Sequence, residues 1–369
     1  MCKNHHEIFE LNTAHKLTET TMPIQPNFLE RTAFFTLNAA PAPMLDLAGA
    51  LAFQTVRAAV EINLFDKLNA HPATLAELSH SLGCPERGLE KLLQALASIN
   101  YVTEKDGRYH NTALVQKWFF DSDMMDIKAA MHLFNTYFLD FWPHAPEVLQ
   151  SGERPYQFYE FINNNPELSH AFQQTMVGNA KLIGPDIVKK IRLPEEGGRL
   201  LDIGGGHGVF AIQFCQANPQ LQATILDSAL ALETAKKHVS DHRLTDRIEL
   251  VSGDIWQRDW ERAYDVILLF NFIHNFDLDA NIKLLQKAHA ALNPGGQVAI
   301  LDQLEGAVSG SAANAIVQLL GFMYYLLANG RTFSHEEIRS MVGQAGFRNV
   351  QIHTSAKWTG SSLVTAIKQ

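Results

Sequence analysis

The chain has 369 residues, of which 46% are hydrophobic and 19% are charged, and its formal net charge at pH 7 is −9. A globular chain of this length exceeds one ordinary core, so we expect two domains. The acidic balance argues against a nucleic-acid partner, which would normally require a basic face. Cys2, Cys84 and Cys215 stand at unrelated positions. Their spacing predicts neither a disulfide framework nor a metal site. We therefore expect a reducing, cytoplasmic setting.

The first segment, residues 1–43, is polar and shows no sustained period, so we expect a polar N-terminal extension. No basic flank precedes a long apolar run there, and no signal peptide is expected. The longest apolar stretch, residues 315–328, contains Gln318 and is too short to span a bilayer. We therefore expect no membrane partner.

Residues 44–120 have the pattern of several helices followed by a hairpin. Apolar side chains repeat at three- and four-residue intervals, Thr74 and Glu77 have capping-box spacing, and Asp106-Gly107 suits a hairpin tip. The expected helices span 44–65, 74–78 and 85–98, and the expected hairpin spans 101–109. This order predicts a winged helix.

A winged helix raises the possibility of a DNA-binding regulator. DNA binding needs a basic recognition helix, but the charged side chains of residues 85–98 sum to zero. Without a net positive charge to neutralise DNA phosphates, this helix lacks the electrostatic attraction that dominates DNA binding. DNA binding therefore remains a remote alternative.

Residues 121–185 predict a helical linker that is unusually rich in aromatic side chains. A sheet of alternating strands and helices carries no substrate pocket of its own, so neighbouring helices must supply one. Phe172 and Met176 stand four residues apart, on one face of such a helix. A flat aromatic or polyketide-like molecule would suit this lining.

Strands and helices alternate through residues 186–369, which predicts an α/β fold with a mostly parallel sheet. The expected strands span 199–203, 222–226, 248–252, 264–270 and 297–302. The expected helices span 208–217, 229–239, 279–292, 312–328 and 334–345. A closing pair at 350–353 and 363–367 predicts an antiparallel terminal hairpin, which is unusual for a dehydrogenase half-domain.

The first strand of this region ends at a glycine turn, Gly204-Gly205-Gly206-His207-Gly208, and a helix follows. Such a turn binds nucleotide-like cofactors. One register suits a dinucleotide, but Asp202 stands just ahead of the glycines and would repel a pyrophosphate. It suits a cationic cofactor such as S-adenosylmethionine. Asp227, at the next strand end, suits a ribose in either cofactor, and Asp254 could accept the adenine amine.

Six segments jointly carry a resemblance to a known family. They are LLDIGGGHG (200–208), LD (226–227), GDIW (253–256), NFIHNFD (271–277), LNPGGQVAILD (292–302) and GRTFSHEEI (330–338). In order and spacing they resemble the small-molecule O-methyltransferases of the caffeate and acetylserotonin type. These are class I, Rossmann-like enzymes with an N-terminal winged-helix dimerisation domain. The resemblance runs from about Met44 to the C-terminus. It implies a homodimer of secondary metabolism that uses S-adenosylmethionine and needs no metal.

The resemblance also implies roles for individual residues. His274 would be the general base, oriented by Asp302, for methylation of a hydroxyl group. Phe172 and Met176 match family positions that line the acceptor pocket, and Phe322 and Tyr325 are further pocket candidates. The expected cofactor residues are Asp202, Gly204, Gly206, Gly208, Asp227, Asp254 and Ile255.

Three departures from the family pattern leave the chemistry open. Asn275 and Phe276 replace the middle of the histidine motif, Gly330 stands where a plant branch has a glutamate, and Phe270 stands where relatives carry a basic residue. N- or C-methylation therefore remain alternatives. So does a non-methylating reaction, such as a decarboxylation, a dehydration or a pericyclic step, in an enzyme that binds the same cofactor.

Overall fold

The computed structural model describes residues 26–121, 126–194, 197–260, 263–306, 311–354 and 360–369. Most of the expected polar extension, residues 1–43, therefore lies outside the described residues. The chain divides into two compact units, Met1–Ser122 and Asp123–Gln369. Each unit is described by itself.

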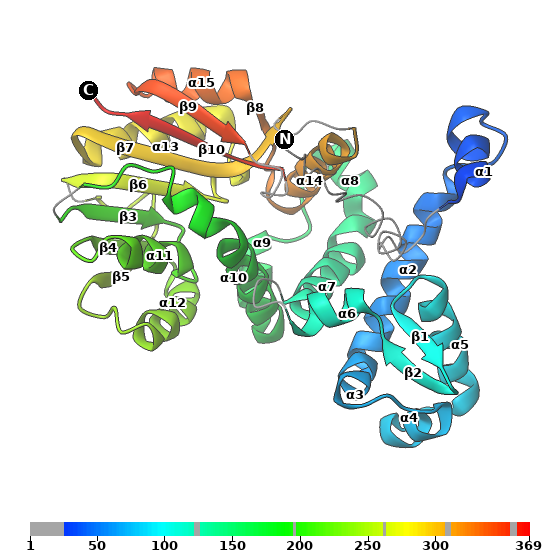
Figure 1. The fold of residues 1–369 in the computed structure, drawn as a ribbon. Coiled ribbons are helices and arrows are strands. Elements are labelled where there is room, and N and C mark those ends of the chain that lie inside the picture. The colour runs from blue at the N-terminus through cyan, green and yellow to red at the C-terminus, as the bar shows by residue number, and fades with distance from the viewer. Residues whose placement is uncertain (1–25, 122–125, 195–196, 261–262, 307–310, 355–359) are drawn as a thin grey trace, which may run out of the picture. The chain divides into compact units, whose positions relative to one another are not determined.

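The first unit contains the expected series of helices and the expected hairpin (Figure 1). Its helices are α1 (Phe28–Arg31), α2 (Met44–Glu61), α3 (Leu64–Ala70), α4 (Leu75–Leu82), α5 (Glu86–Ser98) and α6 (Ala113–Val115), with π-helical turns at Thr32–Thr36 and Gln116–Phe120. Strands β1 (Val102–Lys105) and β2 (Arg108–Asn111) pair antiparallel around Asp106 and Gly107, which both have positive φ. This backbone is the one that a tight hairpin requires.

Two helices of this unit differ from their predicted spans. Helix α4 ends at Leu82 rather than at residue 78. The single helix expected over residues 44–65 is two helices, α2 and α3, because Asn63 adopts the left-handed conformation with φ 58°. Asparagine tolerates this conformation better than most residues do. The left-handed conformation at Asn63 ends the α-helical hydrogen bonding of α2. Periodicity continues across the break, so the apolar pattern alone does not reveal it.

The second unit is built on one mixed sheet in the order β5-β4-β3-β6-β7-β10-β9, with β8 paired to β7 (Figure 1). Its strands are β3 (Arg199–Ile203), β4 (Gln222–Asp227), β5 (Ile248–Ser252), β6 (Tyr264–Phe270), β7 (Leu292–Glu305), β8 (Phe333–Ser334), β9 (Arg348–Thr354) and β10 (Ser361–Ile367). The first five run parallel, and β10 is antiparallel to both β7 and β9. The expected mostly parallel sheet with an antiparallel terminal hairpin is confirmed.

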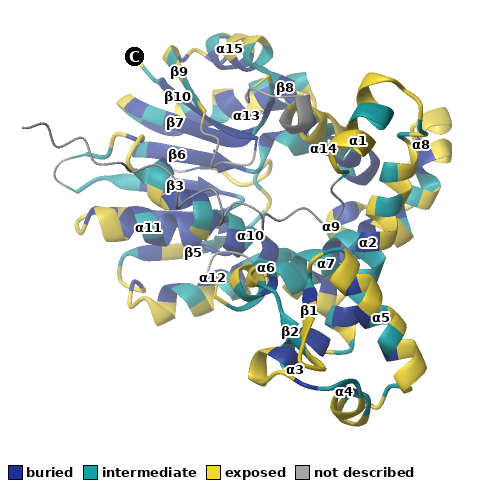
Figure 2. Ribbon diagram, turned by 45° about the vertical axis from the view of Figure 1, so that its right-hand side comes forward, coloured by how far each residue is buried: buried dark blue, intermediate teal, exposed yellow. Residues whose placement is uncertain are grey.

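Helices α10 (Pro166–Val188), α11 (Val209–Ala217) and α12 (Ala229–Asp241) cover one face of this sheet, and α13 (Leu278–Ala291) and α15 (His335–Gln344) cover the other. Helices α7 (Ile127–Thr136), α8 (Ala145–Ser151), α9 (Phe158–Asn163) and α14 (Ser311–Ala328) pack in two separate apolar clusters, one of which includes the first turns of α10. Successive residues of β3 alternate between the two faces. Leu200 packs with α10, α11 and α12, whereas Leu201 and Ile203 pack with α13 and α15. Buried residues accordingly fill the strands, and exposed ones lie on the outer helix faces (Figure 2).

The sheet also explains where a ligand can bind. Strand β3 pairs with β4 on one side and with β6 on the other. The order in which the strands are added to the sheet therefore reverses at β3. A crevice forms at the carboxyl ends of the strands at such a switch point. The glycine turn that follows Ile203 lies at this position.

Four strands depart from the predictions by two residues or more. Strands β9 and β10 begin two residues earlier than predicted, at Arg348 and Ser361. Strand β7 covers Leu292–Glu305 rather than 297–302, and β8 was not predicted. Strand β8 exists because Phe333 and Ser334 pair with Leu304 and Glu305. A local sequence pattern cannot report a two-residue pairing of this kind.

Candidate active site

The glycine turn needs glycine at several positions. Gly204, Gly206 and Gly208 have φ values of 69°, 28° and 74°, which side chains rarely permit. A Cβ atom at Gly204 would also lie 2.5 Å from the Phe272 ring. The bare backbone therefore fits closely between β3 and the residues that follow β6.

Asp227, the last residue of β4, holds this turn. Its Oδ2 accepts a hydrogen bond of 2.9 Å from the Gly206 N–H, and its Oδ1 accepts one of 2.6 Å from the Ser228 N–H. Burial raises the pKa of the Asp227 carboxyl, and the hydrogen bonds from Ser228 and Gly206 oppose that shift. Asp227 is therefore a half-buried acid fixed at the edge of the turn.

Asp202 is a second acid, buried beneath the same turn. It is 1% exposed, and among the described residues its Oδ2 has no hydrogen-bond partner. Burial, and then the charge of Asp227, raises the pKa of Asp202 to about 8. The carboxyl is therefore mostly protonated at neutral pH, and a cation brought beside it would favour its ionised form.

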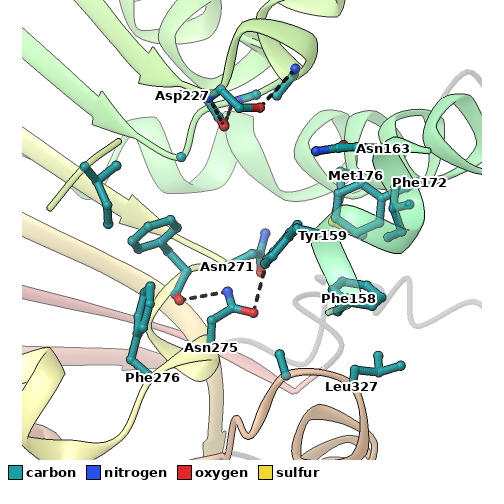
Figure 3. A pocket seen from close by; sticks show the side chains of 18 of the residues that line it. Phe158, Tyr159, Asn163, Phe172, Met176, Asp227, Asn271, Asn275, Phe276 and Leu327 are labelled. Atoms are coloured by element: carbon teal, nitrogen blue, oxygen red, sulfur yellow. Dashed lines mark hydrogen bonds between the residues drawn. The ribbon is translucent and has the colours of Figure 1, made fainter. Parts of the chain in front are cut away.

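A cavity of about 880 Å³ opens from this turn, entirely within the second unit (Figure 3). One end is formed by the glycine turn with Asp202, Asp227 and Asp254. The other is formed by the segment between α8 and α9, by α9 and α10, and by the end of α14. The apolar wall there includes Phe158, Tyr159, Phe172, Met176 and Leu327. The cavity thus has an acidic end and an aromatic end.

A hydrogen bond crosses the aromatic part of the cavity (Figure 3). The Tyr159 hydroxyl on α9 donates to Oδ1 of Asn275 over 3.1 Å, and Nδ2 of Asn275 donates to the Phe272 carbonyl over 3.0 Å. The Tyr159 hydroxyl is a donor at neutral pH, because a phenol titrates only near pH 10. The bond fixes α9 against the segment that carries His274.

His274 follows β6, and Asp302 of β7 orients it. Their Nδ1 and Oδ1 atoms are 2.8 Å apart, and Oδ2 of Asp302 accepts the His274 backbone N–H over 3.2 Å. Because a carboxylate accepts at Nδ1, that nitrogen carries the proton, and Nε2 is left as the basic nitrogen. The His274 side chain is 12% exposed and the Asp302 side chain is 1% exposed. This arrangement can remove a proton from a substrate that reaches Nε2.

Two further contacts, which were not predicted from the sequence, fix His274. Its ring stacks on Tyr324 with centroids 4.0 Å apart and planes 13° apart, and the Tyr324 hydroxyl donates to Oε1 of Gln303. The His274 carbonyl accepts the Arg331 N–H over 2.9 Å. A Cβ atom at Gly330 would lie 2.0 Å from that carbonyl oxygen. Gly330 thus lets the chain pass against the His274 backbone, and it leaves no room for the glutamate of the plant branch.

We expect Gly330→Ala to lower both turnover and stability, because its methyl group must displace the His274 backbone. Forcing a methyl group into such a contact typically costs about 1–3 kcal/mol. Turnover of an acceptor and the free energy of unfolding would both be measured. Gly343→Ala on α15 is the matched control, since a Cβ atom there meets nothing within 4 Å. Equal behaviour of the two variants would contradict the packing argument.

The cavity wall includes most but not all of the predicted site residues. It contains Asp202, Gly204, Gly206, Asp227, Asp254, Ile255, Phe172 and Met176, and it does not contain Gly208, His274, Asp302, Phe322 or Tyr325. Two residues of the His274 segment, Phe272 and Asn275, are nevertheless wall residues. Phe322 packs on Trp142, and the Tyr325 ring packs against the Arg154 guanidinium.

Several wall residues were not predicted from the sequence. They are chiefly Arg154, Tyr159, Gln173, Asn275, Leu327 and Asn329. Asn275 stands inside the histidine motif, which was a usable signal. The others come from helices and connections whose packing no local pattern specifies.

The structure fits a cationic cofactor better than a pyrophosphate. Asp202 has a buried carboxylate oxygen with no hydrogen-bond partner among the described residues, and its pKa is raised. Both features indicate that the glycine-turn end of the cavity lacks positive charge. A ligand that carries an ammonium and a sulfonium would supply that charge, and a pyrophosphate would add repulsion. Within the described part of the chain, no group of three His, Cys, Asp or Glu side chains is placed to hold a metal ion. No described helix is long and apolar enough to cross a membrane.

The raised Asp202 pKa predicts proton release when a cation binds. In the unfolded chain an aspartate titrates near pH 3.9, so between about pH 4 and pH 8 only the folded state holds this proton. The free energy of unfolding should therefore fall by up to about 1.4 kcal/mol per pH unit across this window.

Calorimetry at pH 7 in buffers of different ionisation enthalpy should show proton release on binding S-adenosylmethionine. Asp202→Asn should abolish both effects, and an unchanged release would contradict the assignment.

Known protein families match both units of the chain. Residues 149–348 match the O-methyltransferase domain, and residues 45–119 match the O-methyltransferase dimerisation domain. The chain is 27% identical over 346 residues to the L-tyrosine C(3)-methyltransferase of Streptomyces lavendulae, covering 89% of this chain and 94% of that protein. It is 27% identical over 321 residues to the tetracenomycin polyketide synthesis 8-O-methyl transferase TcmO of Streptomyces glaucescens, covering 84% and 92%.

A solved structure shows the same fold. Human N-acetylserotonin methyltransferase, solved in complex with SAM, aligns with a TM-score of 0.77 at 20% identity, covering 89% of this chain and 97% of that chain. The family match confirms the predicted methyltransferase class and S-adenosylmethionine as the cofactor. Since the O-methyltransferase domain spans more than half of its residues, the chain belongs to the O-methyltransferase family.

Proposed function

We propose that this protein transfers a methyl group to a hydroxyl of a small aromatic or polyketide-like metabolite, with His274 as the general base. One observation carries the proposal. The paired His274 and Asp302 stand next to Asn275, a wall residue of a cavity that has an acidic end at the glycine turn and an aromatic end between helices. Such a cavity suits a cationic donor beside a flat acceptor.

The acidic end would hold the cofactor. Gly204, Gly206 and Gly208 shape the turn, Asp227 takes the ribose, and Asp254 with Ile255 takes the adenine. Asp202 lies beneath the turn, where its carboxylate compensates the positive charge of the cofactor. When bound there, S-adenosylmethionine supplies an activated methyl group on its sulfonium.

The residues of the chain then have two tasks, which are alignment of the acceptor and removal of its proton. A phenol with a pKa of about 10 is mostly protonated at neutral pH, so a positioned base accelerates the reaction. Asp302 holds His274 in the tautomer that leaves Nε2 basic, and it stabilises the imidazolium that forms when the proton arrives. The Tyr324 stack and the Arg331 N–H keep the ring in place.

The aromatic end would bind the acceptor. Phe172 and Met176 of α10 lie in this wall, and Tyr159 presents its ring beside them (Figure 3). Such side chains bind flat rings well. By their names, the two related methyltransferases act on L-tyrosine and in the synthesis of a polyketide, which agrees with this acceptor class.

The first unit would form a homodimer with a second copy of the chain. It matches a dimerisation domain, and its described part exposes large apolar side chains. They include Phe28, Leu29, Phe35, Leu37, Met44, Leu47 and Leu51. Apolar surface of this kind is typical of protein interfaces.

The proposal is tested by incubating the protein with S-adenosylmethionine and a panel of phenols and following products by mass spectrometry. A gain of one methyl group on an acceptor oxygen, together with formation of S-adenosylhomocysteine, supports it. Methylation only at nitrogen or carbon, or cofactor binding without transfer to any panel member, would contradict it.

A further inference from the structure

The aromatic end of the cavity contains one positive charge that the proposed reaction does not use. Among the described wall residues, the acids and bases other than histidine and tyrosine are Glu153, Arg154, Asp202, Asp227 and Asp254. Burial lowers the pKa of His207 to about 3, so that wall residue is neutral. Arg154 is therefore the cation of a wall that otherwise carries acids.

The Arg154 guanidinium is held in place by neutral groups. Its Nε donates to the Tyr325 carbonyl over 2.8 Å, one terminal nitrogen donates to the Gly152 carbonyl over 3.0 Å, and the other donates to Oδ1 of Asn329 over 3.1 Å. Its central carbon also lies 4.7 Å from the centroid of the Tyr325 ring. These contacts connect the segment before α9 to the end of α14 and fix the plane of the guanidinium.

These contacts leave binding capacity unused. A guanidinium has five N–H donors, so with these three bonds one donor remains on each terminal nitrogen. Within the described residues, no carboxylate forms an ion pair with Arg154. Glu153 also lines the cavity, but it is exposed to solvent. A cation that is fixed, half-buried and without a counter-ion suits an anionic ligand.

We propose that Arg154 binds a carboxylate substituent of the aromatic acceptor. The two remaining donors belong to the terminal nitrogens, whose planar fork matches the planar oxygens of a carboxylate. The acceptor ring would lie along the aromatic wall, with its carboxylate at Arg154 and its hydroxyl toward His274. This inference rests on the proposed function and defines its substrate class as hydroxylated aromatic acids. Arg154 would thus determine specificity without taking part in the chemistry.

The inference is tested by binding of a matched pair of probes to protein saturated with S-adenosylhomocysteine. The probes are 3-hydroxy-2-naphthoate and its uncharged carboxamide, titrated by calorimetry. The wild type should prefer the acid, and Arg154→Met should weaken acid binding by about 10- to 100-fold while changing amide binding by no more than about threefold. Arg154→Lys should recover only part of the preference, because it retains the charge and loses the fork. Arg192→Met, at an exposed arginine outside the cavity wall, is the control and should change neither.

Other outcomes overturn the inference. A wild type that binds the acid no better than the amide contradicts it, and so does equal weakening of both probes in Arg154→Met and Arg154→Lys. The latter result would mean that Arg154 only supports the packing of α14. S-adenosylhomocysteine affinity is measured separately for each variant. A wild type that fails to bind S-adenosylhomocysteine contradicts the proposed function itself.

Discussion

Replacement of His274 by alanine should lower kcat for a phenolic acceptor by about 10²- to 10⁴-fold and leave the affinity for S-adenosylmethionine unchanged. The reason is geometric. Asp302 fixes the His274 ring so that Nε2 is the basic nitrogen, and the cofactor residues lie on other elements, at the ends of β3 and β4. The base can therefore be removed without disturbing the cofactor end. Single-turnover rates and cofactor titrations would measure the two effects separately.

Two further variants sharpen this test. Asp302→Asn should also lower kcat, because an amide cannot stabilise the His274 imidazolium as a carboxylate does. His242→Ala, at an exposed histidine just after α12, should behave as the wild type. Unchanged turnover in His274→Ala would refute the base assignment. Loss of cofactor affinity in that variant would show that His274 has a structural role.

Replacement of Asp227 by alanine should weaken cofactor binding by about 10- to 100-fold, the range expected for loss of a charged hydrogen-bond partner. Asp227 has a double role in the proposed site. Its carboxylate would take the ribose, and it also accepts the Gly206 N–H that closes the glycine turn. Without the carboxylate the turn loses both a ligand group and a support. Calorimetric titration of S-adenosylhomocysteine would measure the change.

Asp279→Ala is the matched control, because Asp279 is an exposed acid in the first turn of α13 and lies outside the cavity wall. It removes the same charge without touching the site. Wild-type affinity in Asp227→Ala would contradict the placement of the cofactor at the end of β4. Equal losses in both variants would indicate a general electrostatic effect.

The sequence predicts the sheet well because its strands are continuous apolar runs. Residues 199–203, for example, are read as a strand and form β3 with the same bounds, since a parallel strand buried on both faces needs apolar side chains throughout. Prediction was poorer where pairing between distant segments decides the structure. Strand β8 exists only through β7, and Asn63 breaks a helix whose apolar periodicity continues on both sides.

The candidate site divides in the same way. Asp202 and Asp227 could be predicted because parallel strands place their carboxyl ends at one edge of the sheet. Tyr159 and Arg154 could not, because their positions depend on how α8, α9 and the end of α14 pack. The predicted pocket residues Phe322 and Tyr325 show the same limit: they belong to α14, but Leu327 and Ala328 are the residues of this helix that line the cavity. The apolar periodicity of a helix predicts which residues share one face. Only tertiary packing determines which of its residues line the cavity.

The most direct test of the central claim is a calorimetric comparison of S-adenosylmethionine and NAD⁺ on the purified protein at pH 7. The acidic glycine turn predicts saturable binding of the cationic methyl donor, accompanied by proton release from Asp202, and no binding of the dinucleotide. Binding of NAD⁺ together with failure to bind S-adenosylmethionine or S-adenosylhomocysteine would contradict the account.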